Sequence, residues 1–398
     1  MRAWRLLGSI AVVTSAAFFA VPAAPAQACG GGMVTEADAN VAVTAQRVFV
    51  STRAAGTTDI VAQLDVTGSK SYGVLIPLPS QPTLDTTPID SKELDALDRA
   101  TQVHLYSSEE SYEPEDTGCS CGGDAAKDGG SFGGGVQNGL GDRGVSASEF
   151  VDIGPVSASV LQADTGASLA SWLTDNGFSV AADDQSVIDS YVGTGKHFIV
   201  VKRADGAPAG RSSIGLHFTL QGDQRGYPLR MAQVGAAREL SLSVYVSSEF
   251  GSAPTAPFQT LTLNNLAIDG VTDGEPEDQL AKNYARAIRA AVTERQGKAF
   301  VIEGVYAASD ALASSPALFA LTDAGHRLSR LTTIVDSTTL DTDVAFTAPA
   351  PENVPTDREV GANAPAPQGV KQAFSIFGLL LPALLGLTAR RIRREPRA

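Results

Sequence analysis

The chain has 398 residues, of which 43% are hydrophobic, and it carries a formal net charge of −14. That share of apolar side chains supports a sizeable core and excludes a wholly disordered chain. The excess of acidic residues repels phosphate backbones, so we expect no nucleic acid among the partners of this protein.

Residues 1–28 have the pattern of a secretory signal peptide. Two arginines precede an uncharged apolar run, and Ala26-Gln27-Ala28 supplies the small residues that a signal peptidase requires. We therefore predict that this segment is removed during export and that Cys29 begins the mature chain. Lipidation of Cys29 is the alternative, although Ala26 and Gln27 depart from the usual sequence before a lipidated cysteine.

Three strands and a helix are predicted next. Residues 41–50, 59–67 and 72–76 are rich in β-branched residues or alternate between apolar and other side chains, which is typical of strands. Ser91 is expected to cap a helix that carries Leu94, Leu97 and Ala100 on one face.

Residues 107–144 form an insertion of different composition. Acidic residues are dense at its start and glycines dominate its remainder, so we expect a flexible surface segment. The last six residues match the Gly-x-Gly-x-x-Gly pattern of dinucleotide-binding loops. The segment lacks the preceding strand and the following helix that a working site requires, so we expect no cofactor there.

The second half of the domain mixes helices and strands. Strands are predicted near residues 148–153 and 157–163, followed by two helices with apolar positions at Leu169, Trp172, Leu173, Val187, Ile188 and Tyr191. Three further strands are predicted over residues 196–203, 212–220 and 239–247. The last two alternate strictly, which indicates strands with one buried face, as in antiparallel sheets.

The last elements of the domain are a long helix at residues 276–296, a strand at 298–307, a broken helix at 309–330 and a strand at 344–347. This order does not follow a regular βαβ alternation. We therefore expect an α+β fold with a largely antiparallel sheet and several packed helices, in one extracytoplasmic domain over residues 29–347.

The C-terminal end predicts a membrane anchor. A proline-rich spacer over residues 348–372 leads into an uncharged apolar segment, 373–389, which as a helix would be about 26 Å long and would just span a bilayer core. The tail, residues 390–398, is basic. We expect it to stay in the cytoplasm and to stop transfer through Arg390, Arg391, Arg393 and Arg394. A sorting tail that is cut off after export is the alternative to a lasting anchor.

Several stretches of the chain resemble a bacterial domain-of-unknown-function family, number 2330. They are Cys29-Gly30-Gly31, Ile76-Pro77-Leu78-Pro79, Val151-Asp152-Ile153-Gly154-Pro155, Trp172-Leu173-Thr174-Asp175-Asn176-Gly177-Phe178, Tyr227-Pro228-Leu229-Arg230 and Leu328-Ser329-Arg330-Leu331-Thr332. The resemblance covers most of residues 29–347 and implies an exported, C-terminally anchored protein. The family has no established activity, so the resemblance implies no mechanism.

Residues with chemical potential are few. Cys29, Cys119 and Cys121 are candidates for a disulfide or for a reactive thiol pair. No two histidines lie three or four residues apart, so we predict no metal site, although His197 and His217 lie in predicted strands that could converge.

The sequence supports three hypotheses about function. The first is a non-enzymatic binding or structural module at the cell surface, held by its membrane helix and facing an unknown protein or cell-envelope partner. The second is an envelope hydrolase that uses His197 or His217 in a site without a sequence motif. The third is a thiol redox protein that uses Cys119 and Cys121.

Overall fold

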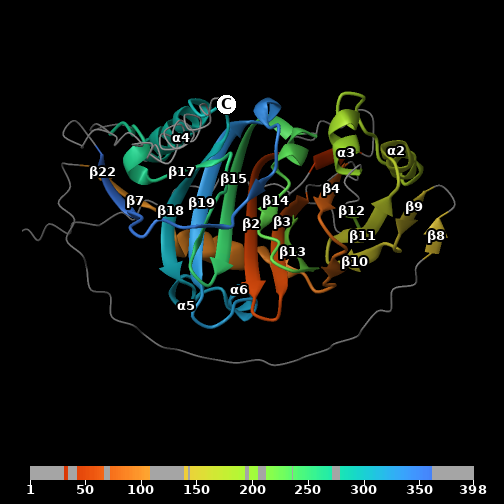
Figure 1. Ribbon diagram of the computed structural model, residues 1–398, viewed down its shortest axis with the longest axis horizontal. Helices are drawn as coiled ribbons and strands as arrows, with labels where there is room; N and C mark the ends of the chain where they lie inside the picture. Colours follow the sequence, from red (N-terminus) through yellow and green to blue (C-terminus); the bar gives the residue numbers. More distant parts are fainter. Residues whose placement is uncertain are drawn as a thin grey trace, which may run out of the picture.

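The computed structural model describes residues 31–34, 43–66, 72–107, 139–141, 144–192, 197–204, 212–234, 236–270 and 278–360. Within these residues the protein consists of two large β-sheets, three short two-stranded sheets and six α-helices (Figure 1). The predicted α+β class is confirmed. The predicted signal peptide, most of the insertion, the apolar segment 373–389 and the basic tail lie outside the described residues. No helix in the described part of the chain is long and apolar enough to cross a membrane.

The larger sheet has nine strands, and its main path runs in the order β17-β18-β19-β15-β2-β3-β13-β5, with β6 paired to β13. It is mixed, because β2 pairs with β15 and β17 with β18 in parallel while the other pairs are antiparallel. Its strands are β2 (Val43–Arg53), β3 (Thr57–Val66), β5 (Thr83–Leu84), β6 (Ile89–Asp90), β13 (Ser212–Gln221), β15 (Ala236–Ser248), β17 (Gln259–Leu261), β18 (Ala299–Ala307) and β19 (Arg327–Asp336).

Successive side chains along each strand point to opposite faces of this sheet. In β13, Leu216 and Phe218 join the central hydrophobic core, while His217 between them points to the opposite face. In β3, Ile60 and Ala62 likewise face the central core, whereas Asp59 belongs to the other face. The alternation in the sequence therefore places His217 and Asp59 on one face of two neighbouring strands.

The smaller sheet is antiparallel and runs in the order β1-β4-β12-β11-β9-β8, with β10 paired to β11. One face joins the central core with the larger sheet, and the other packs against α2 (Gly166–Asp175) and α3 (Gln185–Val192). Its strands are β1 (Gly31–Val34), β4 (Tyr72–Leu78), β8 (Gly139–Gly141), β9 (Val145–Ala147), β10 (Val151–Ile153), β11 (Val156–Ala163) and β12 (His197–Arg203).

Helices cover both faces of the larger sheet. On the central-core face, α4 (Gln279–Thr293) packs its buried residues Ile288 and Ala291. The opposite face is covered by α1 (Ser91–Ala100), α5 (Ala308–Ala311) and α6 (Pro316–Ala320), which pack on Phe49, Val61 and Tyr245.

Local predictions differ from the structure at the cap of α1 and around residues 309–330. The cap of α1 is Asp90 and not Ser91, because the Asp90 carboxylate accepts the N–H of Lys92 at 3.0 Å and leaves Ser91 as the first helical residue. The predicted broken helix at 309–330 corresponds to α5 and α6, but its last residues, 327–330, belong instead to the strand β19. That strand was missed because residues 328–335 are all buried, so it has no period-two pattern.

The first part of the predicted spacer packs on the domain. Ala348–Pro349 forms β21, which pairs with β16 (Ser252–Ala253), and Asp357–Val360 forms β22, which pairs in parallel with β7 (His104–Ser107). Arg358 is buried and donates to the carbonyl oxygens of Leu263 and Leu266, which fixes β22 to the domain. Packed residues therefore reach Val360.

Candidate functional site

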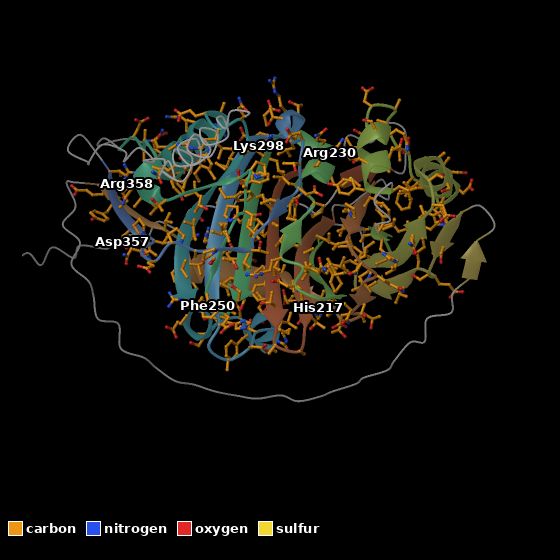
Figure 2. The ribbon with its side chains drawn as sticks, in the orientation of Figure 1. His217, Arg230, Phe250, Lys298, Asp357 and Arg358 are labelled. Atoms are coloured by element: carbon orange, nitrogen blue, oxygen red, sulfur yellow. The ribbon has the colours of Figure 1, made fainter. Side chains whose placement is uncertain are left out.

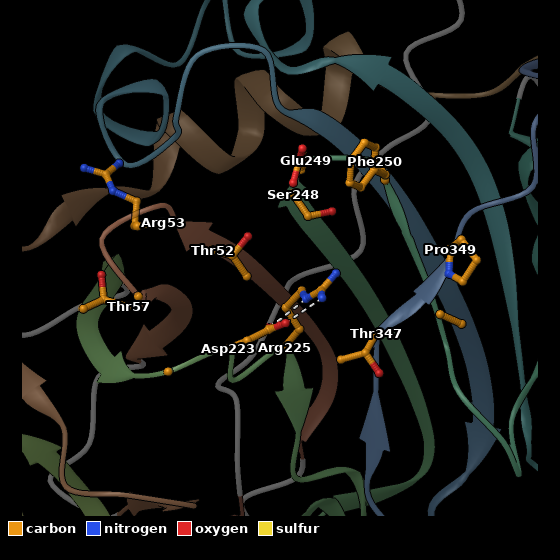
Figure 3. Close-up of a pocket in the computed structure, with 14 residues that line it drawn as sticks. Thr52, Arg53, Thr57, Asp223, Arg225, Ser248, Glu249, Phe250, Thr347 and Pro349 are labelled. Carbon is orange, nitrogen blue, oxygen red and sulfur yellow. Dashed lines mark hydrogen bonds and ion pairs between the residues drawn. The ribbon is translucent and has the colours of Figure 1, made fainter.

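A hollow of about 440 Å³ lies at one end of the larger sheet, where four connections meet (Figure 3). These connections are the β2–β3 turn, the segment before β14 (Gly226–Tyr227), the β15–β16 turn and the segment between β20 (Val344–Ala345) and β21. The side chains that line the hollow are Thr52, Arg53, Thr57, Asp223, Arg225, Ser248, Glu249, Phe250, Thr347, Ala348 and Pro349. Its volume is within the range of small-molecule sites.

An arginine–aspartate pair forms one wall of the hollow. Arg225 donates to both carboxylate oxygens of Asp223, from Nε at 2.8 Å and from Nη2 at 2.6 Å, and its Nη1 donates to Ser252 Oγ at 2.8 Å. The Arg225 hydrogen bond outweighs the effect of partial burial and lowers the pKa of Asp223 below its ordinary value. This two-point geometry holds both planar groups in one orientation.

The turn that carries this pair is fixed to the β2–β3 hairpin. Thr58 Oγ1 donates to the Gly222 carbonyl at 2.7 Å and accepts the N–H of Gln224 at 2.9 Å. The Gly222 N–H donates to the Gly56 carbonyl at 2.8 Å. The wall is therefore held by bonds that need no ligand.

Hydroxyl groups from two neighbouring strands form the floor. Because β2 and β15 are parallel and Ser51 pairs with Ser247, the next residues, Thr52 and Ser248, lie side by side (Figure 3). Ser248 Oγ lies 2.9 Å from Ser252 Oγ, so it is joined to the hydroxyl that Arg225 binds.

Arg53 lies at the edge of the hollow and connects it to α6. Its Nη1 donates to the Ala320 carbonyl at 3.0 Å, and its Nε lies 3.5 Å from Asp59 and 3.7 Å from Asp323. The cation is therefore already balanced by two carboxylates.

His217, a predicted hydrolase candidate, lies between two carboxylates. Its Nδ1 is 3.1 Å from Asp85 and its Nε2 is 3.0 Å from Asp59, which also accepts the Thr219 hydroxyl at 2.8 Å. Burial alone would lower the pKa of His217, but the hydrogen bonds to Asp59 and Asp85 raise it above 6.5. Burial would raise the pKa of Asp59, yet bonds from His217 and Thr219 bring it below 3.8.

This arrangement favours the imidazolium form of His217 and uses both ring nitrogens. A general base needs a free nitrogen within reach of the proton that it takes. The arrangement therefore suits a structural role, in which charged His217 holds β13, β3 and the segment after β5 together as a clamp.

The second predicted histidine, His197, lies elsewhere. It is in β12 of the smaller sheet, whereas His217 is in β13 of the larger sheet, so the two do not converge. Burial lowers the pKa of His197, and its Nδ1 has no hydrogen-bond partner among the described residues.

A third histidine contacts a serine. His326 Nδ1 lies 3.3 Å from Ser247 Oγ, and burial is the main cause that lowers the pKa of this histidine. Ser247 is 0% exposed, so its hydroxyl does not reach a substrate in solution. Among the described residues no hydrogen bond joins His326 to a carboxylate that would orient it.

The remaining predicted site residues are not placed. Cys29, Cys119, Cys121 and the four tail arginines lie outside the described residues. In the part of the chain that the structure covers, no group of three His, Cys, Asp or Glu side chains is close enough to hold a metal ion.

None of the residues of the hollow was predicted from the sequence. Their one shared signal is position, since each lies in or beside a turn at a strand end. Phe250 is the clearest case, because a large aromatic between Glu249 and Gly251 in a turn has no core to join. Its side chain is 75% exposed.

Comparisons with known proteins give one match. Residues 23–359 match the family model described as an uncharacterised protein conserved in bacteria, DUF2330. No curated protein and no solved structure matches the chain significantly. The family match covers most of the chain and nearly all of its described residues, and the chain therefore belongs to this bacterial family.

Proposed function

We propose that this protein is a membrane-tethered, extracytoplasmic binding module and that the hollow at the end of the larger sheet is its ligand site. The observation that carries the proposal is the hollow itself, which has a volume of about 440 Å³, hydroxyl, carboxylate and guanidinium groups in its lining, and a largely exposed aromatic at its rim. Loops held by a rigid sheet are common places for binding sites, since the sheet keeps their geometry fixed.

The position outside the membrane is supported by the two ends of the sequence. An arginine-led apolar segment with small residues at 26–28 favours export, and the apolar segment 373–389 followed by Arg390, Arg391, Arg393 and Arg394 favours a C-terminal stop. The acidic composition favours a partner other than nucleic acid or an anionic lipid surface.

Photo-crosslinking in living cells tests the binding proposal. A benzophenone analogue of phenylalanine replaces Phe250 in the full chain, and in a control chain it replaces Phe319, which is also exposed but does not line the hollow. We expect an adduct of defined mass from position 250 only. The same adducts from both positions, or none from either, would refute a ligand site at the hollow.

Protease treatment tests the location separately. Protease added to intact cells, or to spheroplasts where an outer membrane is present, is expected to digest the domain and leave a short membrane-bound fragment. Recovery of the full precursor from the cytosol would refute the export and the tether but would leave the ligand site standing.

A further inference from the structure

The charges that line the hollow indicate which class of ligand it binds. This inference rests on the proposed function, in which the hollow is a ligand site. The two arginines that line the hollow both have carboxylate partners, Arg225 with Asp223 and Arg53 with Asp59 and Asp323. Glu249, on the rim, adds a negative charge. Because both arginines are neutralised by carboxylates, the hollow does not favour an anionic ligand. The guanidinium groups would repel a cationic ligand, so a neutral ligand fits best.

The hydrogen-bonding groups of the hollow act in both directions. The hydroxyls of Thr52, Thr57 and Thr347 can each donate and accept, Asp223 accepts, and Arg225 donates, whereas the Ser248 hydroxyl is 3% exposed and already paired with Ser252. The Arg225–Asp223 pair is held at two points, at 2.8 and 2.6 Å, so both partners keep a fixed orientation. A ligand that carries several neighbouring hydroxyl groups matches this set, because a hydroxyl also donates and accepts.

Phe250 supplies the apolar part of the site. It is the most exposed of the three large apolar side chains that are exposed among the described residues, at 75% against 46% for Phe319 and 40% for Val151. Figure 3 shows its ring beside Glu249 and Ser248 at the rim of the hollow, and Figure 2 places it near the lower end of the molecule as drawn. Gly251 follows with φ +75°, a conformation that allows the turn to present the ring.

We propose that the hollow binds a neutral saccharide, with the Phe250 ring stacked against the C–H face of a sugar and the Asp223–Arg225 pair bonded to its hydroxyl groups. A pyranose ring has an apolar face of C–H bonds and a rim of hydroxyls, so it needs an aromatic surface beside donors and acceptors of fixed direction.

Binding of defined probes to the full chain tests the inference. The chain is purified in a detergent without a sugar headgroup, since a glycoside detergent would compete for the site. Saturation-transfer NMR and titration calorimetry are then run with cellobiose and N,N′-diacetylchitobiose, and in parallel with alanyl-alanine and inorganic phosphate. We expect binding of at least one disaccharide, and no binding of the dipeptide or of phosphate.

Variants locate the binding. Phe250→Ala is expected to lower the affinity for the disaccharide about tenfold. Asp223→Asn, which removes one charge from the Arg225 pair, is expected to weaken binding to a similar degree. The control Phe319→Ala is expected to leave it unchanged within about twofold. Phe250 and Phe319 are both exposed, so neither truncation is expected to disturb folding.

Each other outcome has a distinct meaning. If only the dipeptide or phosphate binds, and Asp223→Asn alters that binding, the saccharide is wrong while the hollow remains a ligand site. If a disaccharide binds with equal affinity to Phe250→Ala, the stacked geometry is refuted. If none of the four probes binds, the saccharide inference fails, and the crosslinking at position 250 then decides whether the site itself survives.

Discussion

We predict that the ion pairs of His217 stabilise the folded state, so that the stability of the protein depends on this one imidazole. His217 and Asp59 are 9% and 7% exposed and their charged atoms lie 3.0 Å apart. Removing one partner of a buried ion pair costs about 3–5 kcal/mol, because the other charge stays buried. When His217 is removed, Asp59 keeps Thr219 and Arg53 as partners. The Asp85 side chain is 43% exposed, so its ion pair with His217 contributes little to stability. We therefore expect a loss of stability near the lower limit of this range.

His217→Gln is therefore expected to lower the free energy of unfolding by about 3 kcal/mol at pH 6. Because the entropy of unfolding grows with chain length, for a domain of this size that is a fall in Tm of about 4–6 °C. The matched control is His104→Gln, since His104 is exposed at the start of β7. Its effect is expected to stay within about 0.5 kcal/mol.

The pH dependence gives a second readout of the same clamp. The folded pKa of His217 is raised above the ordinary value of 6.5, so the folded state holds its proton more tightly than the unfolded state. The stabilisation is complete below pH 6.5 and is lost as pH rises through the folded pKa. Thermal unfolding of the full chain at pH 5 to 9, followed by circular dichroism, should show this loss in the parent and in His104→Gln, and should not show it in His217→Gln. Equal pH slopes in all three proteins would refute the clamp.

Three further predictions concern the rest of the fold. A Cβ at Gly73 would lie 2.2 Å from the buried Phe178 ring, so Gly73→Ala is expected to cost about 1–3 kcal/mol in urea unfolding, and an unchanged midpoint would contradict that packing. Glu303 forms a buried ion pair with Arg330, with 2.5 Å between Glu303 Oε2 and Arg330 Nε. Glu303→Gln weakens this pair and should lower the free energy of unfolding by about 3 kcal/mol. A loss below about 0.5 kcal/mol would mean that the pair is not buried in solution. Arg358→Met should speed hydrogen exchange at residues 357–360 and 104–107 by at least about tenfold, and equal protection in variant and parent would show that Arg358 does not hold β22.

Much of the fold could be predicted from local patterns. Alternation predicted β13 and β15, and the long helix predicted at residues 276–296 is α4, which begins and ends within three residues of its predicted limits. Strand pairing could not be predicted in the same way. The parallel pairing of β2 with β15 joins segments nearly 200 residues apart, and no turn between them fixes its register.

The candidate site depends on that distant pairing. Thr52 and Ser248 come together because β2 and β15 are neighbours in register, and Asp223 joins them through the hairpin contact of Thr58. The His217 clamp is an intermediate case. The alternation puts His217 and Asp59 on the faces of their strands that point away from the central core, but only the pairing of β3 with β13 brings their charged atoms within 3.0 Å.

The parallel pair of β7 and β22 has a mechanical consequence for a chain that is held by its C-terminal end, as we propose. Tension would enter β22 at Val360, while β7 is held from its other end, where Thr101 is buried and accepts hydrogen bonds from Arg330 and Tyr306. Since the two strands run in the same direction, such tension pulls them past each other lengthwise and loads their backbone hydrogen bonds together. Hydrogen bonds that are loaded together resist a larger force than bonds that open one after another. The last strand of the domain would therefore protect the core of the domain from tension at its C-terminal end.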